Sequence, residues 1–286
     1  MHQYRLAASN IGWQAQDDGA VYAVLRDLGY TGLEIAPTRF VGERPYFKTE
    51  AAARKAAGLK GQYGLCIPSM QSIWFGRTEN IFDARGAALL AEYTRRAVDF
   101  AAAVGCPSLV FGNPRQRRMP EGVRAKSACA GDMHAGDTHI GDTHAQGVRP
   151  EDALGFFAEI SAYARQHGVV IALEANPPVY GTNFCNTSAE AFAYARRVPG
   201  LRVNYDLGTM LTNGESLDVL FENLDIVSHI HLSEPQLAPI APRPEHRALA
   251  RALRQAGYTG FVSIEMKTQP LDTVREVLAY TAEVFA

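Results

Sequence analysis

The chain has 286 residues, of which 47% are hydrophobic and 20% charged, a composition typical of a folded globular protein rather than a disordered chain. Its net charge of −2 gives no basic surface for nucleic acid, and no run approaches the ~20 apolar residues of a membrane helix. Its four cysteines include no CxxC pair, which argues against a zinc ribbon or a disulfide framework. Because the N-terminus also lacks the apolar core of a signal peptide, we expect a cytoplasmic protein.

Short β-rich runs alternate with helical patterns along the chain. The expected strands are residues 4–11, 32–36, 65–71, 108–112, 169–175, 202–208, 227–234 and 261–267. Between them apolar residues recur at helical spacing, as in the helix that carries Leu90, Tyr93 and Ala97 and stops at Gly105. Eight β–α units predict an α/β fold, a (βα)8 TIM barrel, built by one domain over residues 1–286. An open doubly wound sheet is the alternative, but the first strand ends in SNIGWQAQDD and not in a Gly-rich phosphate loop.

Acidic residues and histidines stand where the last four strands end. In chain order these are Glu174, Asp206, the pair His229 and His231, Glu234, Glu265 and Lys267. In a barrel the carboxyl ends of the strands form the active-site face, so these side chains are expected to converge. Crowded carboxylates repel each other unless a cation lies between them, and three carboxylates with one imidazole suit Mn²⁺, Mg²⁺, Co²⁺, Fe²⁺ or Zn²⁺. The alternative, in which each acid pairs with a lysine or arginine, is less favoured for four residues in register.

The motifs LEANPP, NYDLG, HIHLSEP and GYTGFVSIEM occur in this order, and they resemble the xylose isomerase-like TIM barrels. The resemblance is strongest to the sugar phosphate isomerase and epimerase branch and runs from LGYTGLEIA onward. It implies a carbohydrate-like small molecule as substrate and one divalent metal ion, bound by Glu174, Asp206, His231 and Glu265. In related ketose epimerases two glutamates also move the proton, so the resemblance makes Glu174 and Glu265 the expected catalytic pair.

The expected activity is that of a metal-dependent isomerase or epimerase, which removes a proton next to a sugar carbonyl and forms an enediolate. The chain departs from the epimerases it resembles at two substrate-contacting positions, where Thr209 replaces a histidine and Leu237 replaces an arginine. A modified or phosphorylated sugar is therefore expected. Further expected substrate-binding residues are Glu34, Gln71, Asn113, Arg115, Asn176, Glu234 and Lys267. His229 is expected behind the ligands or in the core, and His246 on the surface.

Three other functions stay open. A lyase that dehydrates an inosose or keto acid would use the same proton abstraction and then expel a β-hydroxyl. An endonuclease-IV-like hydrolase shares the barrel but uses three metals and more histidines, and no histidine stands on strands two to four here. A non-catalytic metal or sugar binder would not need a proton-moving pair of glutamates. A homo-oligomer is compatible with the sequence.

The stretch AGDMHAGDTHIGDTH, residues 130–144, places His134, His139 and His144 five residues apart. Neighbours at this spacing point roughly 140° apart in a helix and to opposite faces in a strand, so regular structure does not gather them. We expect a loosely packed insertion at about residues 113–149, in the loop after the fourth strand, and not the catalytic metal site. Deleting residues 130–144 should leave the fold and the bound metal intact by circular dichroism and elemental analysis. Loss of the stoichiometric metal would instead identify the repeat as the site.

Overall fold

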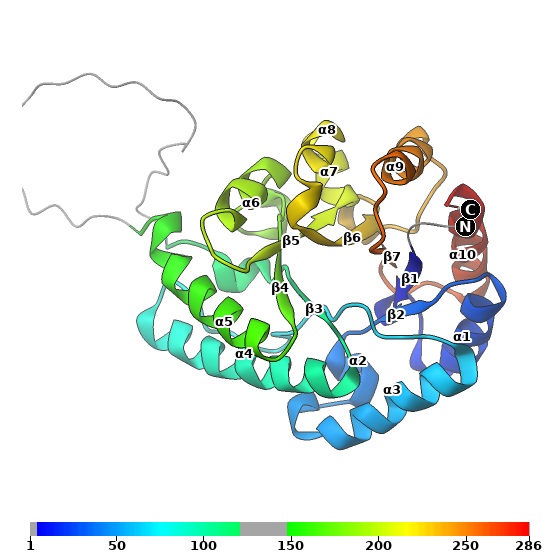
Figure 1. Ribbon diagram of the computed structural model, residues 1–286, viewed down its shortest axis with the longest axis horizontal. Coiled ribbons are helices and arrows are strands. Elements are labelled where there is room, and N and C mark those ends of the chain that lie inside the picture. Colours follow the sequence, from blue (N-terminus) through cyan, green and yellow to red (C-terminus); the bar gives the residue numbers. More distant parts are fainter. Residues whose placement is uncertain (1–4, 121–147, 286) are drawn as a thin grey trace, which may run out of the picture.

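The computed structural model describes residues 5–120 and 148–285, in which strands and helices alternate as predicted (Figure 1). The strands are β1 Arg5–Ser9, β2 Gly32–Glu34, β3 Ser108–Phe111, β4 Val170–Glu174, β5 Arg202–Asp206, β6 Val227–Ser233 and β7 Phe261–Glu265. The helices are α1 Asp18–Asp27, α2 Pro37–Val41, α3 Thr49–Tyr63, α4 Ala84–Val104, α5 Leu154–Gln166, α6 Ser188–Ala195, α7 Leu207–Asn213, α8 Asp218–Phe221, α9 Pro244–Gln255 and α10 Leu271–Val284. The repeat at residues 130–144 lies outside the described residues.

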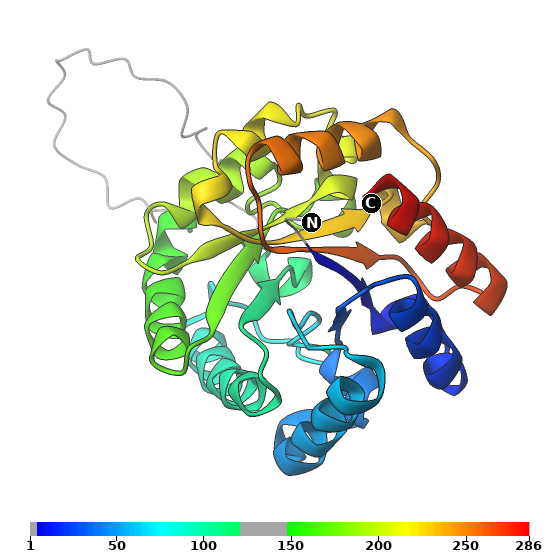
Figure 2. The same ribbon diagram turned by 45° about the vertical axis from the view of Figure 1, so that its right-hand side comes forward.

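The strands follow one another in parallel around a ring, in the order β2-β1-β7-β6-β5-β4-β3. Residues 65–71 close this ring between β2 and β3, but they form no continuous strand. Their isolated parallel bridges are Gly32–Cys66, Ile35–Met70 and Met70–Leu109. The prediction of a regular third strand was therefore wrong, because Pro68 has no N–H to donate and interrupts the ladder. The barrel itself is confirmed, with the helices arranged outside the strands (Figure 2).

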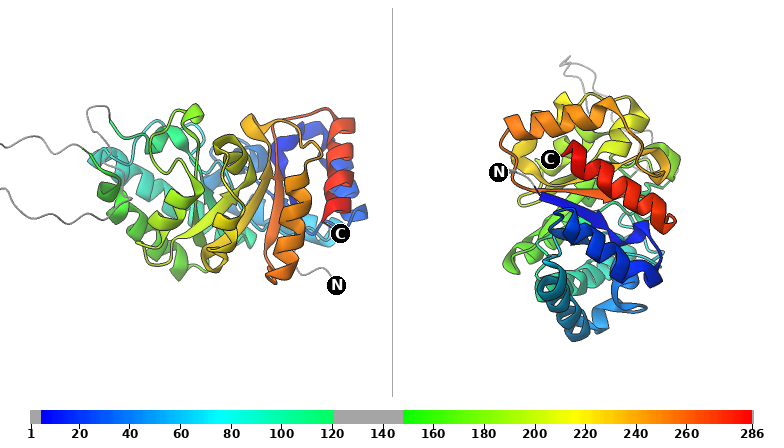
Figure 3. Two further views of the ribbon diagram at one scale, coloured as in Figure 1. Left: turned by 90° about the horizontal axis from the view of Figure 1, so that it is seen from above. Right: turned by 90° about the vertical axis from the view of Figure 1, so that its right-hand side faces the viewer.

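The ends of the helices follow from local sequence signals. Asp83 caps α4 by accepting a hydrogen bond from Gly86 N at 2.6 Å, and the helix stops at Gly105, whose φ of 73° is left-handed. At the seam of the ring, α10 packs beside α1, and the Tyr30 hydroxyl donates to the Leu278 carbonyl at 2.9 Å (Figure 3). No helix in the described part of the chain is long and apolar enough to cross a membrane.

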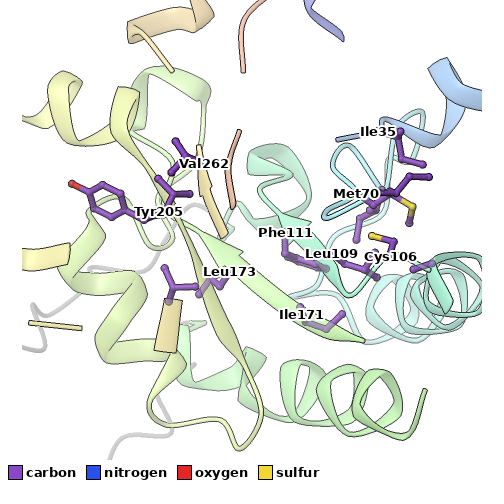
Figure 4. Close-up of a cluster of buried hydrophobic side chains, with 14 of the residues drawn as sticks. Ile35, Met70, Cys106, Leu109, Phe111, Ile171, Leu173, Tyr205 and Val262 are labelled. Carbon is purple, nitrogen blue, oxygen red and sulfur yellow. The ribbon is translucent and has the colours of Figure 1, made fainter. Parts of the chain in front are cut away.

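Alternate residues of each strand face either the helices or the inside of the barrel. Leu109, Ile171 and Leu173 are fully buried and belong to the apolar layer between strands and helices (Figure 4). Burying each such side chain stabilises the fold by about 1.5–3 kcal/mol. By contrast, Glu34 of β2 lies 2.9 Å from His231 of β6, although these strands are not neighbours in the sheet. That contact crosses the inside of the barrel, so the interior is polar and holds ionisable groups.

Candidate metal centre

Four side chains from four consecutive strands meet at the carboxyl end of the barrel. Glu174, Asp206 and Glu265 are the last residues of β4, β5 and β7, and His231 lies two residues before the end of β6. Asp206 and His231 are partners in the sheet, so their strands hold them level. One ligand atom from each of the four residues lies within 4.8 Å of the other three. The structure thus brings together the residues that the sequence predicted as metal ligands, and these four side chains are called the metal group below.

The imidazole of His231 shows why this group fits a cation. Its Nδ1 is buried without a hydrogen-bond partner, 3.1 Å from both Glu174 Oε2 and Glu265 Oε2. Its Nε2 lies 2.9 Å from Glu34 Oε2, and when Nε2 donates its proton there, the lone pair of Nδ1 faces the carboxylates. Electron-pair donors that converge in this way repel each other, whereas a divalent cation between them would be attracted by all of them.

Burial and mutual repulsion change the protonation of the group. Desolvation, helped by the charge of Glu174, raises the pKa of Glu265 to about 7 and that of Asp206 to about 6. Burial would lower the pKa of His231, but the charges of Glu34 and Glu265 outweigh it and hold that pKa well above its usual value. Near neutral pH the group therefore carries protons that a binding cation must displace.

Because of these raised pKa values, the affinity for a divalent cation is expected to fall steeply between pH 7 and pH 5. Above this window the carboxylates are ionised and available, and within it protons compete for them. Each displaced proton weakens binding about tenfold per pH unit below its pKa, so once both are protonated Glu265 and Asp206 together add about 100-fold per unit to the loss caused by the proton of His231. Competition with a chromogenic chelator across this range measures the slope. An affinity that stays constant down to pH 5 would contradict the assignment.

Glu34 lies behind His231, away from the open end of the barrel. Its Oε2 accepts hydrogen bonds from Ser69 Oγ at 2.5 Å and His231 Nε2 at 2.9 Å, and His229 Nε2 lies 3.1 Å away. Burial would raise the pKa of Glu34, but the charge of His231 and the two imidazole donors lower it. Metal-binding histidines commonly donate their second N–H to such a carboxylate, which orients the ring. The sequence placed Glu34 against substrate, whereas the structure buries it completely as the partner of His231.

Replacing Glu34 with glutamine is expected to weaken metal binding by roughly 10–100-fold, the usual effect of losing the carboxylate that accepts the second N–H of a metal-binding histidine. The neutral amide accepts a weaker hydrogen bond from His231, so the ring becomes less basic and less firmly oriented. Chelator competition measures the affinity, and the visible spectrum of the Co²⁺-loaded protein reports the ligand geometry. Glu50→Gln, on the exposed start of α3, is the matched control. An unchanged affinity and spectrum in Glu34→Gln would rule out this positioning role.

The carboxylates of the group are held by neutral donors. Glu174 Oε2 accepts from Asn204 Nδ2 at 2.6 Å, and Glu174 Oε1 accepts from Asn176 Nδ2 at 3.0 Å. Buried Arg117 in turn donates to Asn176 Oδ1 at 2.5 Å and to the Glu174 carbonyl at 3.0 Å. Asn176, predicted to bind substrate, is thus placed beside the group, where it orients a ligand. The sequence analysis missed Asn204, which its position two residues before Asp206 could have revealed, since alternate residues share a strand face.

Asp206 is oriented by two groups of its own. The backbone N–H of Thr209 donates to Asp206 Oδ1 at 2.5 Å, so this carboxylate also caps α7, and Ser233 Oγ donates to Asp206 Oδ2 at 2.6 Å. Thr209 stands where the related epimerases have a histidine, but its side chain is buried and donates to the Ala175 carbonyl at 3.1 Å. It is therefore directed into the fold and not toward a substrate.

The other residues predicted to bind substrate are dispersed around the open end. Gln71 is buried and donates to Ser9 Oγ at 3.0 Å, Asn113 has a left-handed φ of 46°, and Arg115 and Lys267 are exposed. Glu234 is buried and turned toward the start of α9, where Arg243 Nε donates to it at 2.7 Å.

One further expectation was wrong. His246, expected on the surface, is fully buried with its Nδ1 3.1 Å from the Tyr280 hydroxyl.

The loops that follow β4, β6 and β7 are joined beside the metal group. The Tyr180 hydroxyl oxygen accepts a hydrogen bond from Gln236 N at 3.0 Å, and Lys267 N donates to the Leu237 carbonyl at 2.9 Å. Gln236 and Leu237 have φ angles of 59° and 56°, which are rare outside glycine and concentrate at functional sites. Burial, followed by the charge of nearby Asp206, raises the pKa of Tyr180. The Tyr180 hydroxyl therefore keeps its proton close to the metal group, a feature that the sequence analysis missed.

Comparison with known proteins agrees with this architecture. The fold is similar to that of a 3-keto-D-glucoside 4-epimerase from E. coli, with a TM-score of 0.69 and 16% identity over 98% of this chain and 99% of that one. It is similarly close to a D-psicose 3-epimerase from Clostridium cellulolyticum H10, with a TM-score of 0.70 and 14% identity over 98% of each chain. A family 2 AP endonuclease from Brucella melitensis also matches, at 0.69 and 15% over 98% of each chain.

At such identities the likeness establishes the fold and not the reaction. Comparison with curated protein sequences gives no significant match. A sequence profile described as "Xylose isomerase-like TIM barrel" matches residues 22–284, nearly the whole chain. The chain therefore belongs to the xylose isomerase-like TIM barrel family.

Proposed function

We propose that the protein is a divalent-metal-dependent isomerase or epimerase of a sugar or sugar-derived substrate. One observation carries this proposal: Glu174 and Glu265 each place a carboxylate oxygen 3.1 Å from the same nitrogen of His231. They stand on β4 and β7, with two strands between them, so they approach a bound substrate from different sides. The epimerases of similar fold, which act on a ketoglucoside and on D-psicose, support the choice of reaction class.

The two glutamates are suited to different steps. A divalent cation held by the four ligands would supply Lewis-acid polarisation of the substrate carbonyl, which acidifies the adjacent C–H. Glu265 has a pKa near 7, and in the described part of the chain no side-chain amide or hydroxyl holds its carboxylate, so it is suited to remove that proton. Glu174, oriented by Asn176 and Asn204, is placed to return a proton to the opposite face of the resulting enediolate. Return to the same carbon inverts it, whereas return to the neighbouring carbon gives aldose–ketose isomerisation.

A dehydratase acting on an inosose or keto acid is the second candidate, and Tyr180 is the observation that favours it. Proton abstraction by Glu265 would be followed by loss of a β-hydroxyl, which needs a proton donor. The Tyr180 hydroxyl oxygen accepts from Gln236 N, which leaves its own proton for donation, and its pKa is raised. Tyr180→Phe should therefore lower the turnover of a dehydratase far more than that of an epimerase.

The two remaining alternatives have less support. In the described ranges the second cluster of possible ligands is Glu34, His229 and His231, which shares His231 with the first cluster and is fully buried. Its members already pair through Glu34 Oε2, so these residues offer no set of three separate metals of the kind an endonuclease-IV-like hydrolase uses. A non-catalytic binder would not need a carboxylate whose pKa is near 7.

The test is solvent exchange on a panel of substrates. Metal-loaded protein is incubated in D₂O with free sugars, sugar phosphates, glycosides and inososes, and carbon-bound deuterium is followed by NMR. Deuterium next to a carbonyl without loss of water supports an isomerase or epimerase, whereas loss of water identifies the dehydratase. Stoichiometric metal with no exchange on any member of the panel would overturn the proposal.

A further inference from the structure

A cleft of about 880 Å³ opens at the carboxyl end of the barrel, and none of the four ligands lines it. Its inner border is formed by residues that directly follow strands or the 65–71 segment: Ile11, Ala36, Ser72 and Thr268. Thr268 lies three residues after Glu265, so at ~3.3–3.6 Å per residue their Cα atoms are at most about 11 Å apart. The cleft therefore extends from the end of β7, which carries Glu265, over the ends of β1 and β2 and of the 65–71 segment, which contribute none of the four ligands.

The outer part of the cleft is aromatic. Tyr46 and Tyr93 lie in its wall, and the rings of Phe47 and Phe75 are 63% and 70% exposed. Among the described residues these two phenylalanines are the most exposed aromatic side chains. The other exposed large hydrophobic side chains there are Leu89 and Val179, which do not line the cleft. Exposed aromatic rings gathered in a concave site beside convergent polar groups are typical of a small-molecule binding site.

The charges in the cleft are already compensated. Three of its arginines pair with carboxylates: Arg39 with Asp18, Arg77 with Glu79, and Arg96 with Glu92. The guanidinium of the fourth, Arg44, lies 4.7 Å from the centre of the Phe47 ring. Glu43 adds a negative charge to the lining. A phosphate would have to compete with these partners, so the cleft favours a neutral ligand.

Arg115, which the sequence placed near the site, and its neighbour Arg117 offer no alternative phosphate pocket. Arg115 is exposed on a short 3-10 helix, and Arg117 is fully buried, where it donates to Asn176 and to the Glu174 carbonyl. The cleft is thus aromatic and charge-compensated.

We propose that this cleft binds the second ring of a glycoside: the sugar ring lies at the metal group, and a neutral aromatic or sugar aglycone packs on Phe75, in the wall that Phe47 also lines. A cleft of this volume suits a drug-sized ligand and is too large for a single monosaccharide, most of which would already lie at the metal group. The Phe75 ring, which is 70% exposed, can receive a second ring, whereas the guanidinium groups of Arg44 and Arg96 lie 4.7 Å and 5.3 Å from the centre of the Phe47 ring. The identity of the first ring as a sugar rests on the proposed function, whereas the aglycone subsite rests on the cleft alone.

Equilibrium binding tests the proposal without turnover. Phenyl β-D-glucopyranoside, D-glucose and D-glucose 6-phosphate are titrated into metal-loaded wild-type protein and into Phe75→Ala, Phe47→Ala and the control Leu89→Ala. Leu89 is an exposed apolar residue of α4 that does not line the cleft. We expect the phenyl glycoside to bind at least about tenfold more tightly than glucose, and Phe75→Ala to remove that difference, while glucose binding and Leu89→Ala stay unchanged.

Three outcomes would overturn the subsite. The first is equal binding of the glycoside by wild type and both phenylalanine variants. The second is tighter binding of the phosphate than of the glycoside. The third is a wild-type oligomer that Phe75→Ala dissociates while ligand binding stays unchanged. The last result would identify the cleft as an interface between copies of the chain. If the glycoside binds through Phe75 but no substrate exchanges deuterium, the proposed reaction fails and the subsite stands. If free sugars exchange deuterium equally in wild type and Phe75→Ala, and glycosides are not preferred, the proposed reaction stands and the subsite fails.

Discussion

Replacing Glu265 with glutamine is expected to lower turnover by about 10²–10⁴-fold, the usual contribution of a general acid–base group. The carboxylate of Glu265 has a pKa of about 7 without a cation, so it is partly protonated near neutral pH until a cation binds. A neutral amide of the same shape resembles that protonated form, and the substitution should therefore leave the fold intact. It removes the proton acceptor and keeps an oxygen that can still face the cation.

The experiment separates loss of the base from loss of the metal. Turnover of Glu265→Gln is measured at saturating metal, with bound metal determined by elemental analysis on the same sample. Glu276→Gln, on the exposed face of α10 just after β7, serves as the control for a charge change nearby. Wild-type turnover in a fully metal-loaded Glu265→Gln would rule out Glu265 as the base. A loss of turnover that is seen only at low metal and disappears at saturating metal would assign it a ligand role alone.

The metal group could be predicted because it depends only on rules that a sequence reveals. Parallel strands place their carboxyl ends at one edge, so residues that end consecutive strands must meet there once the strands are identified. The apolar residues that alternate with the ligands, such as Leu173, Ile230 and Ile264, are all buried, as the expected orientation of the strands requires. The strand pattern therefore placed acidic residues and histidines at one edge, and the family resemblance selected the four ligands among them.

The features that escaped prediction depend on contacts across the barrel or between loops. Glu34 contacts His231 only because the ring closes and brings β2 opposite β6, which no local pattern encodes. The residues around Pro68 have strand-like composition, but Pro68 interrupts the hydrogen-bond ladder, so this segment forms isolated bridges and no regular strand. Phe47 ends the short 3-10 helix Pro45–Phe47 and Phe75 lies in a turn, and neither segment is long enough for a periodicity that distinguishes an exposed aromatic ring from a buried one.

Loss of the bound metal is the second large effect expected, and Glu174→Gln is the cleanest variant with which to observe it. Glu174 accepts amide hydrogen bonds at both carboxylate oxygens, so a glutamine there would bring its own NH₂ toward one of these donors. The side-chain oxygen of Asn204 is buried without a hydrogen-bond partner in the described structure, so a flip of the Asn204 amide can accept from that NH₂. The variant should fold while it loses a charged ligand.

His231→Ala removes the only nitrogen ligand, but it is a harsher change. It deprives the buried carboxylate of Glu34 of its closest histidine, and leaving a buried charge short of a partner typically costs about 3–5 kcal/mol. A lower melting temperature is therefore expected for His231→Ala and not for Glu174→Gln. Circular dichroism of both variants shows whether a loss of metal reflects the site or the fold.

The metal content should be measured in protein that lacks residues 130–144, so that the three histidines of the repeat do not contribute ions of their own. Wild-type protein in this background is expected to retain one divalent ion per chain by elemental analysis after dialysis. Glu174→Gln should weaken binding by more than the roughly 10–100-fold that loss of an outer partner costs, because it removes a direct ligand. His167→Ala, on the exposed end of α5, is the histidine control. Unchanged metal content in both Glu174→Gln and His231→Ala would show that the four strand-end residues do not form the metal site.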